Sequence, residues 1–141
     1  MALVGGMLNQ YDYLILHKLE RISEATPNLF NGPDADNMMN NIIDQFQRRL
    51  TGRRKGVFNA VAKAVSNTFN NNSIKINRNR IKLVFREFLL NPENNWRNEF
   101  SDGIVNSANQ FLKNPEMNNY IDSQVQYYRQ MQPNMIRNRP R

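Results

Sequence analysis

The chain has 141 residues, with 19 Lys and Arg, 12 Asp and Glu, and a formal net charge of +7. This length suits one domain with a buried core. The charge favours an anionic partner, with nucleic acid ahead of anionic membrane or an acidic protein. The absence of cysteine excludes disulfide bonds and thiol chemistry.

No apolar run reaches membrane-spanning length, and the first residues lack the basic start of a signal peptide. We therefore expect a protein that is neither transmembrane nor secreted by a signal peptide, located inside a cell or a virion.

The basic residues are concentrated in one part of the chain. Residues 1–44 hold two Lys or Arg and six Asp or Glu, residues 45–86 hold eleven and none, and residues 87–141 hold six of each. A net charge that served only solubility would not need this segregation. The acid-free segment therefore predicts a functional basic surface.

The first helix is predicted from about residue 7 to residue 25, just before Pro27. His17 lies within this helix without a neighbouring ligand or nucleophile, which indicates a surface or boundary residue. The apolar face of the helix recurs at steps of three and four residues: Leu8, Tyr11, Ile15, Leu19 and Ile22.

A loop at residues 28–33 leads to a second helix, which opens with Asp34 and Asp36. No EF-hand pattern follows these acids, and the helix dipole is sufficient reason for carboxylates in a first turn. The buried face of this helix is predicted to be Met39, Ile42, Ile43, Phe46 and Leu50.

A cationic trio between two glycines follows: Arg53, Arg54 and Lys55 lie between Gly52 and Gly56. The spacing does not match the phosphate-binding loop of NTPases. A glycine-flanked turn with three charges and exposed amides is nevertheless suited to phosphate contacts, and the alternative is a turn that only faces solvent. The helix predicted next has Lys63 on its outer side and this apolar face: Phe58, Val61, Ala62, Val65 and Phe69.

After a break at residues 70–73 and a short extended segment at residues 74–76, another helix is predicted from Asn77 or Arg78. Arg78, Lys82 and Arg86 are four residues apart and line one side of it. Like charges at this spacing destabilise a helix by roughly a few tenths of a kcal/mol per pair, a cost that a bound anion would remove. The buried face is predicted to be Ile81, Val84, Phe85, Phe88 and Leu89.

Two similar segments, residues 88–93 and 111–116, both end in Asn-Pro-Glu. In each, the Asn is expected to cap a helix that has Pro at its first position and Glu in its first turn. Trp96 is in step with Phe100 and Ile104, which favours a core position over base stacking. The buried faces of the two helices are predicted to be Trp96, Phe100, Ile104, Ala108 and Phe111, then Met117, Tyr120 or Ile121, Val125 and Tyr128.

These patterns predict an all-α, single-domain bundle of about five to six helices. Residues 1–131 form the predicted helical domain. Residues 132–141 form a basic C-terminal arm that we expect to be flexible or ordered by a partner.

Signatures of catalysis and metal binding are missing from the sequence. The single His has no partner for nucleophilic catalysis, and the Cys and His clusters of zinc sites are absent. Neither glycine-rich nucleotide motif is present. We therefore expect no enzyme activity, no cofactor, no metal site and no small-molecule substrate.

Two functional hypotheses follow. The first is sequence-nonspecific binding to the phosphates of DNA or RNA by a structural protein, such as a coat, nucleocapsid or packaging subunit. The general plan is similar to that of helical coat proteins of filamentous viruses, an analogy of fold alone. The predicted contact residues are Arg48, Arg49, Arg53, Arg54, Lys55, Lys63, Lys75, Arg78, Arg80, Lys82, Arg86, Arg137, Arg139 and Arg141.

The alternative is an assembly subunit of a larger protein or ribonucleoprotein complex. Its basic face would dock on an acidic protein surface or on a neighbouring copy, with residues 1–44 of one chain against residues 45–86 of the next. Peripheral membrane binding ranks last, because no predicted helix combines a strongly basic face with a bulky aromatic face.

Overall fold

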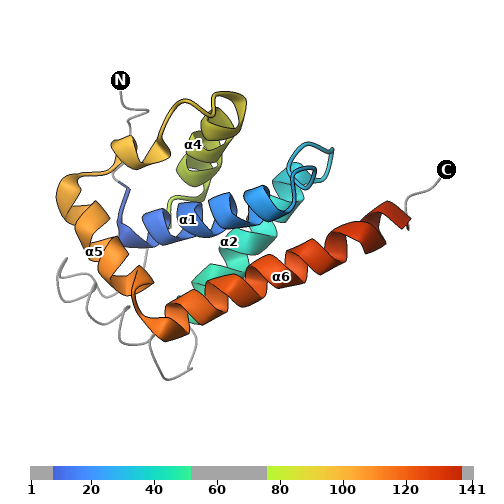
Figure 1. Cartoon of the computed structure of the whole chain (residues 1–141). Helices are drawn as coiled ribbons and strands as arrows, with labels where there is room; N and C mark the ends of the chain where they lie inside the picture. Colours follow the sequence, from blue (N-terminus) through green and yellow to red (C-terminus); the bar gives the residue numbers. More distant parts are fainter. Residues whose placement is uncertain (1–7, 52–75, 138–141) are drawn as a thin grey trace.

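Helix α1 (Gln10–Ala25) lies at the centre of the molecule and packs against α2, α4, α5 and α6 (Figure 1). The computed structural model describes residues 8–51 and 76–137, and the side chains of residues 8–48 and 76–131. Within these ranges the chain is all-helical and forms one compact domain, as the sequence predicts. Around α1 lie α2 (Ala35–Thr51), α4 (Arg78–Leu90), the 3-10 helix η1 (Trp96–Glu99), α5 (Asp102–Leu112) and α6 (Pro115–Arg137).

Helix α1 is buried on more sides than its predicted apolar stripe required. Ten of its 16 residues are buried, and they include Tyr13, Leu14 and Leu16 as well as the stripe itself. A helix that is apolar around most of its circumference belongs in a core, with neighbours on several sides. His17 is half-buried, which confirms its predicted boundary position.

A capping box fixes the start of α1. The side chain of Asn9 accepts a hydrogen bond from the backbone N–H of Asp12 at 3.0 Å, and Oδ2 of Asp12 accepts the N–H of Asn9 at 2.8 Å. This reciprocal pair satisfies two donors that a helix start otherwise leaves without partners. Asp12 is also fully buried.

Helices α2 and α4 lie where they were predicted; on α4, Ile81, Val84 and Phe85 are buried, whereas Phe88 and Leu89 are only partly buried. Met39, Ile42, Ile43 and Phe46 of α2 are buried, and the side chain of Leu50 lies outside the described residues. Helix α4 begins at Arg78 because the side chain of Asn77 caps it, accepting the N–H of Arg80 at 3.2 Å. The helix predicted at residues 58–69 and the extended segment at 74–75 also lie outside the described residues.

The prediction of a helix starting at Asn91-Pro92-Glu93 is wrong. Asn91 is the C-cap of α4, residues 92–94 form a turn, and residues 96–112 are divided between η1 and α5. The side chain of Asn95 accepts the N–H of Arg97 at 3.0 Å and starts η1, whereas Ser101 caps α5. Trp96 and Phe100 are buried all the same, so the predicted core position of Trp96 is confirmed.

The second Asn-Pro-Glu segment behaves as predicted, because Asn114 accepts the N–H of Glu116 at 2.9 Å at the start of α6. Helix α6 packs along α1, where the buried Nζ of Lys18 donates to the hydroxyl of Tyr120 at 2.7 Å. It continues to Arg137, beyond the domain boundary predicted at residue 131. Pro133 lacks an N–H and removes one hydrogen bond, which weakens a helix without always ending it.

Candidate nucleic-acid interface

The structure describes the side chains of five of the fourteen predicted contact residues. These are Arg48 on α2 and Arg78, Arg80, Lys82 and Arg86 on α4. The side chains of Arg49 and Arg137 lie outside the described residues, although both backbones are helical. Five residues of the middle segment and two of the C-terminus lie entirely outside the described ranges: Arg53, Arg54, Lys55, Lys63, Lys75, Arg139 and Arg141.

The predicted basic stripe of α4 faces an acidic stripe of α2 inside the same molecule. Arg78 forms an ion pair with Asp44, and Arg86 forms one with Asp36. Between them, the Nζ of Lys82 lies 3.0 Å from Oδ1 of Asp36 and also donates to the side chain of Asn40 at 3.3 Å.

The register of these contacts shows that the two helices run antiparallel. The start of α2 meets the end of α4, and Asp44, later in α2, meets the start of α4. We call this set of contacts the α2–α4 clamp: Asp36, Asn40 and Asp44 against Arg86, Lys82 and Arg78. Four-residue spacing places each triplet on one side of its helix.

Electrostatics within the clamp offsets the repulsion along the α4 stripe. The hydrogen bond from Lys82 and the charges of Lys82 and Arg86 lower the pKa of Asp36 below its ordinary value, although partial desolvation acts in the opposite direction. The side chain of Lys82 is only 14% exposed. The carboxylates of Asp36 and Asp44 on α2 therefore neutralise the basic stripe of α4. The three cations of the stripe hold the two helices together.

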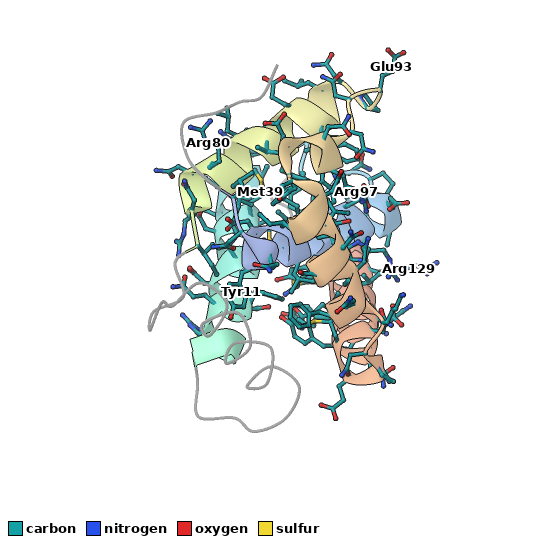
Figure 2. All side chains as sticks on the ribbon, turned by 90° about the vertical axis from the view of Figure 1, so that its left-hand side faces the viewer. Tyr11, Met39, Arg80, Glu93, Arg97 and Arg129 are labelled. Atoms are coloured by element: carbon teal, nitrogen blue, oxygen red, sulfur yellow. The ribbon has the colours of Figure 1, made fainter. Side chains whose placement is uncertain are left out.

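The other two described residues of the predicted set lie outside the clamp. Arg48 is exposed near the end of α2. Arg80 is half-buried, and Figure 2 shows it on the side of α4 that faces away from α1. The pairing of Arg78 with Asp44 brings the start of α4 close to the second half of α2. The chain therefore leaves α2 and returns to α4 at the same end of this helix pair.

A second polar cluster, which the sequence did not reveal, joins α1 to η1. The guanidinium of Arg97 donates to both carboxylate oxygens of Glu20, at 2.9 Å and 3.2 Å, and to the hydroxyl of Tyr13 at 3.1 Å. It also stacks over the ring of Trp96, 4.3 Å from the centroid, and the indole N–H of Trp96 donates to Glu20 at 3.0 Å. This cluster positions η1 against the central helix.

The pKa values in this cluster follow from burial and pairing. Burial alone would raise the pKa of Glu20, but the hydrogen bonds from Arg97 and Trp96 outweigh it and lower the pKa. Burial lowers the pKa of His17, and the positive charge of Arg97 lowers it further. These shifts favour a charged Glu20 and a neutral His17, the states expected of a structural ion pair beside a half-buried imidazole.

The only signal of the clamp in the sequence is that Asp36, Asn40 and Asp44 have the same four-residue spacing as the basic stripe. The pairing of Glu20 with Arg97 had no such signal, because the two residues are far apart in a chain rich in both charges. Within residues 8–51 and 76–137, no group of three or more acidic or His side chains is arranged to hold a metal ion. None of the helices in those ranges has the length and apolar character needed to cross a membrane.

Comparisons with protein-family models, with curated proteins and with solved structures found no match for this chain.

Proposed function

We propose that the middle of the chain binds the phosphates of DNA or RNA without sequence preference, in a structural protein that coats or packages nucleic acid. One observation carries this proposal. Of the eleven Lys and Arg in residues 45–86, three belong to the clamp, which leaves eight with no Asp or Glu among them. These eight are Arg48, Arg49, Arg53, Arg54, Lys55, Lys63, Lys75 and Arg80.

The placement of the described residues supports a concentrated positive field. Arg48 and Arg80 lie on the two helices between which residues 52–75 are inserted, and the clamp joins those helices. The sequence of the inserted segment holds five further cations and no acid. Like charges held close together on a folded surface raise the local concentration of a polyanion and accelerate its association.

Because of the clamp, three of the basic residues of α4 are poorly suited to contact phosphates. A cation that is already paired with a carboxylate gains little from a phosphate, because the existing pair must be broken or left to compete. We therefore assign none of the proposed contacts to the three clamp cations of α4.

Binding of the full chain to a short labelled duplex, followed by fluorescence anisotropy across a salt series, tests the proposed function. Six phosphate contacts would lower the affinity by about a thousandfold between 50 and 200 mM salt. Two duplexes of unrelated sequence should bind equally well, because phosphates carry no sequence information. An absence of binding at low salt, or a strong preference for one of the two sequences, would contradict the proposal.

A further inference from the structure

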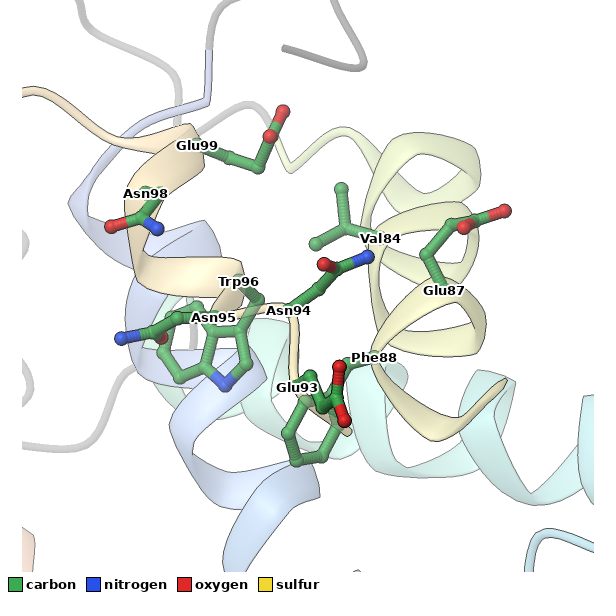
Figure 3. A pocket seen from close by; sticks show the side chains of 9 residues that line it. All are labelled: Val84, Glu87, Phe88, Glu93, Asn94, Asn95, Trp96, Asn98 and Glu99. Atoms are coloured by element: carbon green, nitrogen blue, oxygen red, sulfur yellow. The ribbon is translucent and has the colours of Figure 1, made fainter. Parts of the chain in front are cut away.

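The outer side of α4 and the neighbouring η1 form an acidic groove that the proposed nucleic-acid contacts do not use. The groove has a volume of about 350 Å³, and Glu87, Glu93 and Glu99 are among the residues that line it. Phe88 contributes aromatic surface, whereas Trp96 is only 2% exposed and already stacks with Arg97; Figure 3 shows both side chains at the hollow between α4 and η1. No Lys or Arg is among the residues that line it. An anionic ligand would therefore be repelled here.

Exposed apolar side chains extend the groove along α4. Leu83 is 43% exposed and Leu90 is 76% exposed, and helical spacing places both on the side of α4 that carries Glu87. Within the described residues, only three large hydrophobic side chains are this exposed, and two of them lie on this helix face. The surface therefore suits an occupant that brings both positive charge and apolar side chains.

The geometry points to the C-terminal segment of a second copy of this chain, residues 135–141, as that occupant. This segment combines apolar Met135 and Ile136 with Arg137, Arg139 and Arg141, and it contains no acid. Arginine is the cation best matched to the groove, since its planar guanidinium pairs with carboxylates in a forked geometry and stacks on aromatic rings. Pro140 favours an extended backbone at Arg139, and an extended segment places Arg139 and Arg141 on one side, about 7 Å apart.

A second copy is needed because the chain's own C-terminus is directed elsewhere. Helix α6 has 23 residues and is therefore about 34 Å long. In Figure 1 it carries its C-terminal end away from η1, toward the opposite side of the molecule. The four residues after α6 reach at most about 14 Å when fully extended. Docking between copies therefore links each molecule to a neighbour.

Two charge-reversal variants and their mixture test this assignment by light scattering, after nuclease treatment and purification at high salt. The wild-type chain should self-associate at low salt and dissociate as salt is raised. Arg139→Glu with Arg141→Glu, and separately Glu87→Lys with Glu93→Lys, should each weaken self-association by about tenfold or more. An equimolar mixture of the two variants should associate again, because the reversed charges complement each other.

Glu24→Lys with Asp34→Lys is the matched control, since it makes the same change of net charge at exposed positions outside the groove. This control should associate like the wild type. A wild-type chain that stays monomeric at high concentration and low salt would overturn the inference, as would a mixture that fails to associate. Duplex binding by the groove variant separates this inference from the proposed function, because the eight proposed phosphate contacts are unchanged in it.

Discussion

Replacement of Arg97 by alanine is expected to lower the free energy of unfolding by about 3 kcal/mol. Arg97 holds both carboxylate oxygens of Glu20, donates to Tyr13 and stacks on Trp96. The side chain of Glu20 is only 16% exposed, so its carboxylate would lose a cationic partner that water replaces poorly. The 3-10 helix η1, which lines one side of the acidic groove, would lose these polar contacts with α1.

Denaturant unfolding of three variants measures this effect. Arg97→Ala should show the full loss, and Arg97→Lys should recover less than half of it, because an ammonium cannot make the forked pair or stack as a planar group. Arg21→Ala is the control: it removes another ion pair of α1, with Asp122, whose two side chains are 39% and 58% exposed. That exposed pair should contribute less than about 1 kcal/mol. Equal losses at Arg97 and Arg21 would contradict the structural role assigned to Arg97.

The replacement Asp12→Asn is expected to stabilise the protein at pH 8 and to remove part of its pH dependence. Burial raises the pKa of Asp12 from its ordinary value of 3.8 to about 7, although hydrogen bonds from the backbone of Asn9 and Asn77 act to lower it. Between these two pH values the unfolded chain releases a proton that the folded chain retains. The contribution of Asp12 to stability is therefore greatest below pH 4 and is lost as the pH rises to about 7.

The size of this loss follows from the difference between the two pKa values. About three units correspond to about 4 kcal/mol, most of which the Asp12→Asn variant would regain at pH 8 because an amide cannot ionise. The amide oxygen can still accept the N–H of Asn9 and preserve the capping box. Among the residues that the structure describes, Oδ1 of Asp12 has no hydrogen-bond partner, which agrees with a carboxyl held in its neutral form.

Thermal unfolding of wild type and Asp12→Asn at a series of pH values between 4.5 and 8 measures this difference. The gain in melting temperature should grow with pH and level off above about pH 7. Asp102→Asn is the control, because it removes an exposed acid from the first turn of α5. A pH-independent difference for Asp12→Asn would show that the carboxyl is ionised in the folded protein throughout this range.

Much of the fold could be predicted from hydrophobic periodicity and capping residues. The start of α4 at Asn77 and the end of α1 before Pro27 follow from local chemistry, which is written in the sequence. The central position of α1 was less evident, because the prediction used the strongest apolar stripe and passed over Tyr13, Leu14 and Leu16. A count of all apolar positions would have indicated a helix covered on several sides.

The two Asn-Pro-Glu segments show where local patterns stop being sufficient. Asn114 is followed by Met117 and Ile121, both buried against the core, so a helix starting there gains burial. Asn91 is followed by no apolar residue until Trp96, so a helix starting there would bury nothing in its first turn. The same tripeptide therefore begins α6 in one place and ends up in a turn in the other.

The α2–α4 clamp illustrates the same limit for the candidate site. The sequence predicts that Arg78, Lys82 and Arg86 share one side of a helix, and the structure confirms it. Which surface that side faces depends on how α2 and α4 pack on α1, which is a property of the whole core. An unpaired basic stripe and one paired with a neighbouring helix have the same local pattern.

Two triple variants separate the basic residues that hold the fold together from those proposed to bind nucleic acid. The first variant replaces Arg53, Arg54 and Lys55 by Gln, and the second replaces Arg78, Lys82 and Arg86 by Gln. For both variants, the affinity for a duplex is measured across a salt series, and the melting temperature is measured as well. The first variant should lose affinity by about tenfold or more, with a slope of log affinity against log salt reduced by about 2.7, and keep its melting temperature. The second should melt at a lower temperature and keep the wild-type slope. The opposite result would contradict this division of roles: a slope that falls by about 2.7 for the second variant, together with wild-type binding by the first variant.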